Sequence, residues 1–553
     1  MVLNGAEIII EEFVRHGVET VFGYPGGTVL SIYDALYKNA HRINHILPAH
    51  EQGGAHAADA YARVSGKVGA VIATSGPGAT NLVTGIANAY LDSVPVVFVT
   101  GNVAVPMLGR DSFQEIDIVG VTLPIVKHSY VVRDIKDLQR ALREAFLLAD
   151  SGRKGPVLVD VPRNVQIDTC EYDAGLNVTL SDGARQSHNL SCFNTALEAI
   201  AQSQRPFIYC GGGVTASDCG DKVLELSKKL GAPIGTSIMG IGSVPHSYEL
   251  HLGMSGMHGR YAANIAQSEA DLIIALGVRF SDRATGNTKE YSKNCKVLHI
   301  DIDAAEIGKN VGPDISLCGP LTEILPRLII ESRAKPNDKW LSRVHDIKAA
   351  GDVPTSDDFT PRNIINRVNT FYDSDTVVTT DVGQHQMWVA QYYEFEQPRK
   401  FITSGGLGTM GFGFGAAIGA CFASGRKRTV FFTSEGSFGM NLNEMATAVT
   451  HNLPITIVLL QNGVLGMVRQ WQSLFLGERY SQTTLDRKTD FPALAKAFGA
   501  AGYSAESLKE LDDILKSIPD DSGPCVIDCK IDKNEMVIPM IPAGGTIRDM
   551  LIN

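Results

Sequence analysis

The segment TSEGSFGMNLNEMATAVTHNLPITIVLLQNG, residues 433–463, combines residue types that could bind a metal ion and a diphosphate. An apolar run ends in the polar turn Ser434-Glu435-Gly436, a helical pattern follows, and a second apolar run ends in the amide pair Gln461-Asn462. Carboxylate and amide oxygens suit Mg²⁺, and glycine after a strand lets backbone N–H groups approach phosphate oxygens. The turn departs from Gly-Asp-Gly, which would be expected of such a metal loop. The segment therefore predicts a magnesium and diphosphate site with an altered acid.

Four other apolar runs also end in polar or glycine-rich residues. Ligands on open parallel sheets bind beyond the carboxyl ends of the strands, so these ends are candidate ligand contacts. A single glycine after a strand is usually only a turn, and the recurrence of such ends is what favours binding. The ends are Thr74-Ser75-Gly76-Pro77-Gly78, Gly211-Gly212-Gly213, Arg279-Phe280-Ser281-Asp282-Arg283 and Asp381-Val382-Gly383-Gln384-His385.

The apolar runs that must position these ends form three sets, separated by polar stretches at 171–186 and 334–361. Runs that are apolar on both faces and alternate with helical patterns are typical of parallel sheets covered on both sides. The sequence therefore predicts an α/β fold of three doubly wound parallel-sheet domains, at 1–172, 187–335 and 358–553. The expected strands are 67–76, 95–101 and 155–162, then 205–213, 271–280 and 296–303, then 375–383, 428–436, 454–463 and 523–532.

Composition limits the class of protein. A chain of 553 residues with 44% hydrophobic and 20% charged residues indicates an ordinary globular protein of several domains. The net charge of −11 includes no basic stripe, which argues against nucleic acid, and no apolar stretch reaches the ~18 residues of a membrane span. The N-terminal helical pattern carries Glu11 and Glu12, where a targeting peptide would be basic, and the nine cysteines lack a C-x-x-C pair. We therefore expect a cytoplasmic protein with reduced thiols.

A series of segments, found in the same order along nearly the whole chain, resembles the catalytic large subunit of the acetohydroxyacid synthase (acetolactate synthase) family. That family depends on thiamine diphosphate. The resemblance implies a pyrimidine-binding domain, a central FAD-binding domain and a diphosphate-binding domain. It also implies a homodimer or homotetramer with active sites at the dimer interface, and a possible regulatory small subunit. The segments are HEQGGAHAADAYAR (50–63), TSGPGATNLVTGIANAYLDSVPVV (74–97), SFQEIDIVG (112–120), GMSGMHGRYAAN (253–264), RFSDRATG (279–286), DVGQHQMW (381–388), SGGLGTMGFG (404–413), GMVRQWQ (466–472) and VIPMIPAGG (537–545).

The resemblance gives Glu51 the role of acid/base at the aminopyrimidine ring of thiamine. A glutamate is more often a solvated residue on a helix face, but the flanks of Glu51 are small and nearly uncharged. The resemblance also places Gly78 and Asn81 close to the pyrimidine and Gln114 beside the reacting atoms. Met410 would be an apolar wedge under the cofactor, where plain core packing is the alternative.

The implied reaction decarboxylates pyruvate and joins the remaining two-carbon unit to a second 2-keto acid. The product is 2-acetolactate, or 2-aceto-2-hydroxybutyrate when 2-ketobutyrate is the acceptor, in branched-chain amino-acid biosynthesis. By resemblance, Arg283 binds the carboxylate of the acceptor, and the alternative is a salt bridge to Asp282 or a remote acid. Trp471 would shape the acceptor pocket, where one methylene is worth only ~1–3 kcal/mol.

The remaining implied contacts belong to the cofactors. Mg²⁺ (or Mn²⁺) would be held by Glu435, Asn462 and the backbone carbonyl of Val464. The net reaction transfers no electrons, so the FAD would be structural, and the alternative is an empty nucleotide-like domain. Thiamine diphosphate would contact Val382, Gly383, Gln384, His385, Gly408, Met410, Gly436, Ser437 and Met467, and FAD would contact Gly211, Gly212, Gly213, Met257, His258, Gly277, Arg279, Asp301 and Ile302.

The chain departs from the family pattern at Arg163, at Phe414-Gly415, at Gln461 and at Ser434-Glu435. The exchange at Phe414-Gly415 predicts a change in the start of a helix. Glu435 is one methylene longer than aspartate, about 1.5 Å, and Mg²⁺ demands near-ideal geometry. We therefore expect the metal site to persist but to bind thiamine diphosphate and Mg²⁺ more weakly, and to tolerate Mn²⁺ better.

Three alternatives stay open. In one, Glu435 points away from a weak or empty metal site, and the chain is a catalytically weakened paralogue. In another, the chain is a pyruvate carboligase with a different acceptor, such as a keto-sugar, although Arg283, Met467 and Trp471 favour a small keto acid. In the third, the chain is a silent relative that binds nucleotides or a partner subunit.

Overall fold

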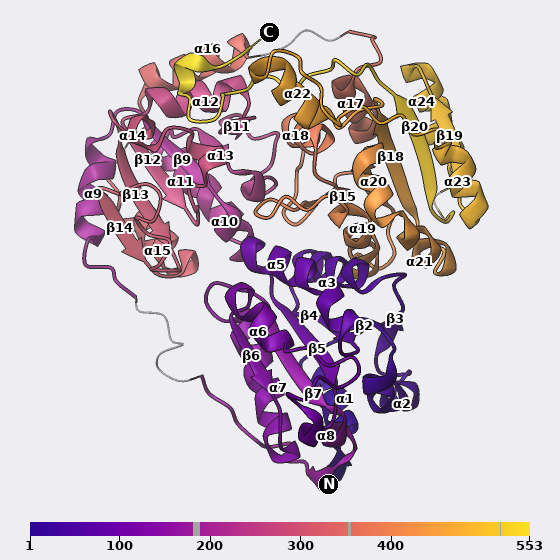
Figure 1. The fold of residues 1–553 in the computed structure, drawn as a ribbon. Helices are drawn as coiled ribbons and strands as arrows, with labels where there is room; N and C mark the ends of the chain where they lie inside the picture. Colours follow the sequence, from indigo (N-terminus) through magenta and orange to yellow (C-terminus); the bar gives the residue numbers. More distant parts are fainter. Residues whose placement is uncertain (181–187, 334, 352–355, 520, 553) are drawn as a thin grey trace.

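The computed structural model describes residues 1–180, 188–333, 335–351, 356–519 and 521–552. Within them lie three six-stranded parallel sheets with helices on both faces, which confirms the predicted α/β class (Figure 1). Each sheet separates two hydrophobic clusters, because its strands are apolar on both sides. No helix among the described residues has the length and apolar character needed to cross a membrane. All nine cysteines are free.

The first sheet has the strand order β3-β2-β4-β5-β7-β6. A short antiparallel pair, β1 (Val2–Asn4) with β8 (Thr169–Glu171), closes the domain and was not predicted. The strands are β2 (Thr20–Tyr24), β3 (Asn44–Ile46), β4 (Gly69–Ala73), β5 (Val96–Asn102), β6 (His128–Val131) and β7 (Val157–Pro162). The helices are α1 (Gly5–Arg15), α2 (Leu30–Lys38), α3 (Glu51–Ser65), α4 (Pro77–Asn81), α5 (Val83–Asp92), α6 (Ile118–Thr122), α7 (Ile135–Asp150) and α8 (Arg163–Ile167).

The central sheet has the order β11-β10-β9-β12-β13-β14. Residues 338–350, which polar composition placed in a linker, form α16, and its Trp340, Val344 and Ile347 pack on this sheet. The strands are β9 (Pro206–Cys210), β10 (Ile234–Thr236), β11 (His251–Met254), β12 (Leu272–Leu276), β13 (Lys296–Asp301) and β14 (Ile315–Cys318). The helices are α9 (Phe193–Gln202), α10 (Gly212–Ala216), α11 (Gly220–Leu230), α12 (Tyr261–Glu269), α13 (Asp282–Thr285), α14 (Thr288–Tyr291), α15 (Leu321–Glu331) and α16 (Asp338–Ala350).

The last sheet has the order β16-β15-β17-β18-β20-β19. Its central strands β17 and β18 pair in parallel, with Thr433 opposite Leu459. The strands are β15 (Val377–Thr380), β16 (Phe401–Ile402), β17 (Thr429–Thr433), β18 (Ile455–Gln461), β19 (Ala501–Ala505) and β20 (Cys525–Lys530). The helices are α17 (Pro361–Phe371), α18 (Gln384–Tyr392), α19 (Phe412–Ala423), α20 (Glu435–Asn441), the 3₁₀ turn η6 (Leu442–Glu444), α21 (Met445–Thr450), α22 (Gly466–Phe475), α23 (Phe491–Phe498) and α24 (Leu508–Ser517).

The first and last domains share one hydrophobic core, in which α3 packs on α19 (Figure 1). A Cβ atom on Gly415 would lie 2.5 Å from the carbonyl oxygen of Gly53, and one on Gly419 would lie 1.9 Å from that of Ala57. The two helices can therefore approach backbone to backbone only because these positions lack side chains. The helix α19 starts at Phe412, so Phe414-Gly415 lies in its first turn, and Gly415 also faces the backbone of α3.

Candidate functional site

The predicted metal loop joins β17 to α20, and Glu435 is the first residue of that helix. The side chain is buried, with 4% of its surface exposed. Its Oε1 accepts hydrogen bonds from the backbone N–H groups of Asn462, at 3.2 Å, and Gly463. Within the described part of the chain, its Oε2 has no hydrogen-bond partner. The longer side chain thus reaches across to the end of β18 and leaves one carboxylate oxygen unsatisfied.

Burial raises the pKa of the Glu435 carboxyl, and the N–H groups of Gly463 and Asn462 oppose that rise. A buried carboxylate oxygen without a partner is costly unless a cation or proton satisfies it, so the donor set fits a cation. In the described ranges, no cluster of three or more His, Cys, Asp or Glu side chains could hold a metal. A cation at this loop therefore depends on one carboxylate, neutral oxygens and the phosphates of a ligand.

The two amides at the end of β18 have different partners. The Oδ1 of Asn462 accepts the N–H of Val464 at 3.2 Å, and its Nδ2 lies 3.5 Å from Oε1 of Gln384. With its amide nitrogen turned toward the acid, Gln461 donates to both carboxylate oxygens of Asp528, at 2.8 and 2.9 Å. Gln461 therefore faces β20, whereas Asn462 lies beside Glu435.

The end of β15 lies next to this loop. The Ser437 hydroxyl donates to the carbonyl of Val382 at 2.9 Å, which ties the two strand ends together. Asp381 is buried and accepts hydrogen bonds from the Gly413 N–H at 2.8 Å and the Thr433 hydroxyl at 2.7 Å. Burial raises the pKa of Asp381 to about 6 and lowers the pKa of His385 to about 3. The residues predicted to hold a diphosphate, Val382, Gly383, Gln384, His385, Gly436 and Ser437, are thus gathered at one edge of the last sheet.

The loop that carries Gly408 and Met410 is held by the first domain of the same chain. Asp92 accepts the N–H groups of Gly405, at 3.1 Å, and Gly406, at 2.7 Å, and it pairs with Arg63 at 3.0 Å. A Cβ on Gly436 would lie 3.7 Å from Cε of Met410. The half-buried Met410 therefore packs against the metal loop, which suits either a wedge or ordinary packing.

Glu51 begins α3 and is half-buried rather than solvated. Its Oε2 accepts a hydrogen bond from Nδ2 of Asn81 at 2.9 Å, and a Cβ on Gly78 would lie 3.2 Å from its Oε1. Gln114 has a positive φ of 59°, and a Cβ on Gly76 would lie 2.9 Å from its carbonyl oxygen. The structure thus brings Glu51, Gly78, Asn81 and Gln114 together around the short helix α4.

These two groups of residues belong to different domains. The hydrogen bond to the Glu51 carboxylate comes from the first domain, and those to the Glu435 carboxylate come from the last. The side chains proposed for substrate form a third group, because the Arg283 guanidinium lies 5.7 Å from the ring centroid of Trp471, as a cation–π contact between α13 and α22.

The alternative partner of Arg283 is also visible. Its Nε lies 3.9 Å from a carboxylate oxygen of Asp282, and both side chains are more than half exposed. An exposed ion pair at this distance contributes little to the free energy of folding, so the Arg283 guanidinium remains available to a ligand. Its Nη1 lies 3.6 Å from Sδ of Met257, in the segment predicted to bind FAD.

The central-domain residues converge at the carboxyl ends of β9, β12 and β13. Gly211 and Gly277 are in backbone contact, because a Cβ on Gly211 would lie 2.0 Å from the carbonyl oxygen of Gly277. Burial raises the pKa of Asp301 to about 6 and lowers the pKa of His258 to about 4. Among the described residues, the buried Nδ1 of His258 has no hydrogen-bond partner. Arg279, which donates to the carbonyl of Leu91, ties this edge to the first domain.

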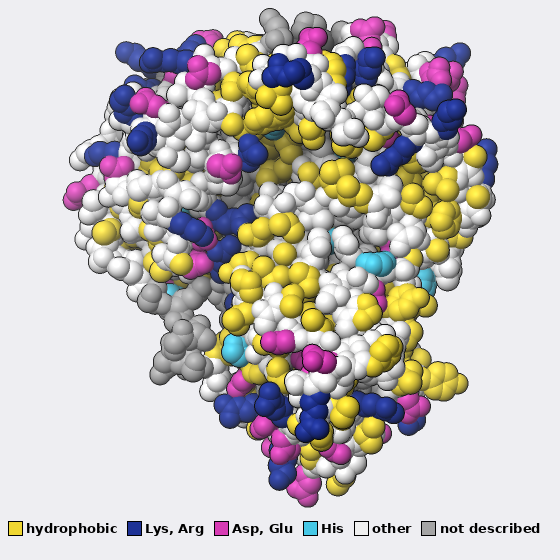
Figure 2. All heavy atoms as spheres, in the orientation of Figure 1, with side chains coloured by type: hydrophobic (Ala, Val, Ile, Leu, Met, Phe, Trp, Pro, Cys, Tyr) yellow, Lys and Arg dark blue, Asp and Glu magenta, His cyan; other side chains and the backbone are white. Residues whose placement is uncertain are grey.

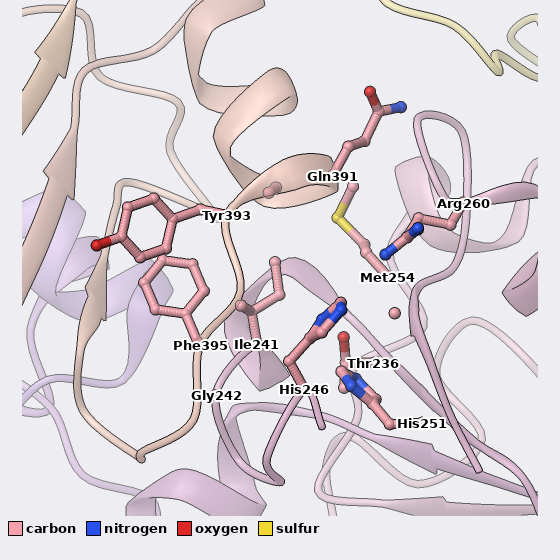
Figure 3. Close-up of a pocket in the computed structure, with 12 residues that line it drawn as sticks. Thr236, Ile241, Gly242, His246, His251, Met254, Arg260, Gln391, Tyr393 and Phe395 are labelled. Atoms are coloured by element: carbon pink, nitrogen blue, oxygen red, sulfur yellow. The ribbon is translucent and has the colours of Figure 1, made fainter. Parts of the chain in front are cut away.

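A separate small cavity lies between the central and last domains and contains none of the predicted site residues (Figure 3). Its volume is about 20 Å³, which suits a single water but not a keto acid. Both ring nitrogens of His251 and Oγ1 of Thr236 are buried there without a partner among the described residues. His246 and Gln391 also line this cavity, which we interpret as a hydrated junction between domains.

Sequence reasoning missed several acids around the strand ends. Asp92, Glu444 and Asp528 are buried or nearly so, and each fixes a loop or helix that carries predicted site residues. The sequence gives a partial indication that these acids are buried, since each stands among largely apolar or uncharged residues.

Comparison with known proteins follows the division into three sheets. Family models described as Thiamine pyrophosphate enzyme match the chain three times: the N-terminal TPP binding domain at 3–121, the central domain at 193–328 and the C-terminal TPP binding domain at 381–529. The acetolactate synthase large subunit of Lactococcus lactis subsp. lactis (strain IL1403) is 44% identical over 547 residues, which is 98% of this chain and 95% of that protein. The large subunit of Porphyra purpurea is 43% identical over 563 residues, with 99% and 95% covered. The acetolactate synthase isozyme 2 large subunit of Escherichia coli (strain K12) is 42% identical over 550 residues, or 99% of each chain. The chain therefore belongs to the acetolactate synthase large-subunit family of thiamine pyrophosphate enzymes.

Proposed function

We propose that the protein is an acetohydroxyacid synthase, which decarboxylates pyruvate and joins the two-carbon unit to a second 2-keto acid. Membership of the family and the half-buried Glu51 carboxylate, held by Asn81 beside Gly78, are what support this proposal. The test is to assay acetolactate formation from pyruvate with and without thiamine diphosphate and Mg²⁺. Activity that does not depend on thiamine diphosphate, or no acetolactate at all, would contradict the proposal.

When bound, thiamine diphosphate would supply a carbanion, formed by loss of a C–H proton, as the nucleophile for the keto carbon of pyruvate, and a sink for the electrons left when CO2 departs. The chain would hold its diphosphate at the ends of β15 and β17, where Val382, Ser437 and the start of α20 meet. Glu435, Asn462 and the carbonyl of Val464 would hold the cation. Met410 and Met467 would line the apolar part of the site.

Glu51 would hold or release a proton at its carboxylate, hydrogen-bonded to the pyrimidine ring. Asn81 keeps one carboxylate oxygen in place through its 2.9 Å hydrogen bond. The other oxygen lies 3.2 Å from where a Cβ on Gly78 would be, so a side chain at this position would crowd the carboxylate. A carboxylate held in this way is suited to acid/base work.

We further propose that a second copy of the chain completes each active site, as the resemblance to the acetohydroxyacid synthase family implies. Large hydrophobic side chains near the groups around Glu51 and Glu435 are exposed, among them Leu47, Phe113, Met440 and Val468. Figure 2 shows hydrophobic side chains gathered across the middle of one face, with charged residues toward its upper rim and lower tip. Such exposure is typical of a surface that a partner covers.

Replacement of Arg283 should weaken the use of the acceptor. The Arg283→Ala variant removes a guanidinium that would bind the carboxylate of the second keto acid, and charge-assisted hydrogen bonds are worth ~1.5–3 kcal/mol. We expect kcat/KM for acetolactate formation to fall about 10- to 150-fold. The control is Asp282→Asn, which removes only the exposed 3.9 Å pair and should leave kcat/KM within about twofold. Equal losses in the two variants would show that Arg283 acts through its ion pair.

The purified protein should contain FAD that stays oxidised during turnover. The buried His258 nitrogen, Asp301 and the glycine contacts at Gly211 and Gly277 support a dinucleotide at this edge of the central sheet. The expected result is a flavin absorbance spectrum that does not bleach when pyruvate is added. A colourless protein whose activity is unaffected by added FAD would place the chain with flavin-free relatives instead.

A further inference from the structure

A buried glutamate of the last domain is bound to the start of the helix that carries Glu51. Glu444 ends the 3₁₀ turn η6, nine residues after Glu435, and its side chain is fully buried. Its Oε1 accepts the backbone N–H of His50 at 3.0 Å, and its Oε2 accepts that of Ala49 at 3.1 Å. His50 is the residue before α3, and Glu51 follows it directly. The two carboxylate oxygens thus fix the two peptide N–H groups that precede Glu51.

The contact depends on a glycine in the first turn of α3. A Cβ on Gly53 would lie 2.1 Å from Oε1 of Glu444, so any other residue would displace the carboxylate. The HEQGG sequence therefore has two roles, since it supplies both the acid Glu51 and the space that the Glu444 carboxylate occupies. Gly415 and Gly419 keep α19 in backbone contact with Gly53 and Ala57 of the same helix.

Among the described residues, the hydrogen-bond partners of Glu444 are dipoles rather than a cation. Besides the two N–H groups, the Thr447 hydroxyl donates to Oε2 at 2.7 Å. The carboxylate lies at the N-terminus of a 15-residue helix, where the helix dipole favours negative charge. Burial raises the pKa of Glu444, and its three hydrogen bonds oppose that rise. Burying an acid without a basic partner costs folding free energy, which favours a role for Glu444 beyond packing.

We propose that Glu444 is a positioning residue for Glu51, so that the domain carrying the metal loop sets the orientation of the catalytic carboxylate in the first domain. This inference rests on the proposed function. Glu444 touches neither carboxylate oxygen of Glu51, whose polar contact is with Asn81. It acts instead on the main chain immediately before Glu51, because it fixes where α3 begins.

The geometry predicts a graded series of variants. In Glu444→Gln only one oxygen remains, and the amide NH2 faces a backbone N–H group, donor against donor. In Glu444→Asp both oxygens remain but are withdrawn by about 1.5 Å, so at least one contact with Ala49 or His50 is lost. In Thr447→Val both backbone contacts remain. The expected order of function is wild type and Thr447→Val, then Glu444→Asp, then Glu444→Gln.

The experiment measures the exchange of the C2 proton of thiamine diphosphate with deuterium, by acid quench and NMR, at saturating thiamine diphosphate and Mg²⁺. This exchange reports the proton chemistry attributed to Glu51 and does not depend on substrate. Because a small displacement of a catalytic group can cost up to about 100-fold, we expect Glu444→Gln to slow exchange about 10- to 100-fold and Glu444→Asp about 3- to 10-fold. The dissociation constant for thiamine diphosphate, from fluorescence quenching, should change less than about threefold, since Glu444 does not lie at the diphosphate.

The matched control is Glu12→Gln. Like Glu444, Glu12 is a fully buried glutamate, but it lies in the first domain, where it pairs with Arg143 and accepts a hydrogen bond from Tyr172. The Glu12→Gln change should lower the melting temperature and leave the exchange rate of the folded protein unchanged. If Glu444→Gln does not fold, Glu444→Asp carries the test, and a wild-type exchange rate in Glu444→Asp overturns the inference. Glu51→Gln separates the two levels of the argument: fast exchange in Glu51→Gln overturns the proposed function itself, whereas slow exchange there with wild-type exchange in Glu444→Gln overturns only the positioning role.

Discussion

The Glu51→Gln variant should lose essentially all acetolactate formation, by about 100- to 10,000-fold, while it folds and binds flavin normally. The loss follows from the removal of the carboxylate in the Asn81–Gly78 corner, which would hold and release a proton at the pyrimidine ring. The fold should survive because the amide oxygen of the glutamine can still accept the hydrogen bond of Asn81, which joins Oε2 of the native residue at 2.9 Å.

Two measurements make this result specific. Circular dichroism and flavin absorbance show that the variant is intact, and the rate of acetolactate formation is then measured at saturating pyruvate. Asn81→Ala is the matched control, since it keeps the carboxylate and removes its 2.9 Å hydrogen bond, so it should lose only about 5- to 15-fold. Wild-type turnover in Glu51→Gln would contradict the assignment of Glu51 and the mechanism built on it.

Much of the fold was predictable because parallel strands buried on both faces leave a plain pattern in sequence. Runs such as 454–463 are continuously apolar and end in polar residues, and they became strands such as β18. The helix α16 was missed because Trp340, Val344 and Ile347 form a narrow apolar stripe in a stretch otherwise rich in charge. The β1–β8 pair was missed because three-residue strands carry too little periodicity.

The candidate site was also predictable only in part. The strand ends and the resemblance were enough to nominate Glu51, Arg283, Trp471 and Glu435, because types and spacing survive in the sequence. Contacts between domains could not be read, since the bonds from Ala49 and His50 to Glu444 cross nearly 400 positions of chain. Nor could the sequence show that Oε1 of Glu435 accepts backbone N–H groups while Oε2 has no partner in the described part of the chain, because that depends on the rotamer.

Replacement of Glu435 should have the second large effect. Glu435→Ala removes the one carboxylate of the proposed metal site, and ligand loss should exceed the 10- to 100-fold that outer-shell changes cost, so Mg²⁺ should bind at least about 100-fold more weakly. The measurement is a titration of Mg²⁺ at fixed thiamine diphosphate, followed by fluorescence. Asp528→Asn is the control, because it removes a neighbouring acid that faces Gln461 rather than the cation, and its effect should be small. Unchanged Mg²⁺ binding in Glu435→Ala would show that Glu435 is not a ligand.

The Glu435→Asp variant tests whether the glutamate weakens cation binding at this loop or whether the loop is adapted to the longer side chain. The native side chain uses Oε1 on the N–H groups of Asn462 and Gly463 and leaves Oε2 for a cation, so one oxygen serves the protein and one serves the metal. An aspartate is about 1.5 Å shorter, which should release those N–H groups and return both oxygens to the cation. We therefore expect Mg²⁺ and thiamine diphosphate to bind about 3- to 10-fold more tightly to Glu435→Asp, and Mn²⁺ to lose its advantage over Mg²⁺. Suppose instead that Glu435→Asp binds Mg²⁺ and thiamine diphosphate no more tightly than the wild type and turns over no faster. The site is then adapted to the longer glutamate, because the hydrogen bonds from the end of β18 to Glu435 stabilise the site as much as a shorter acid at an ideal metal distance would.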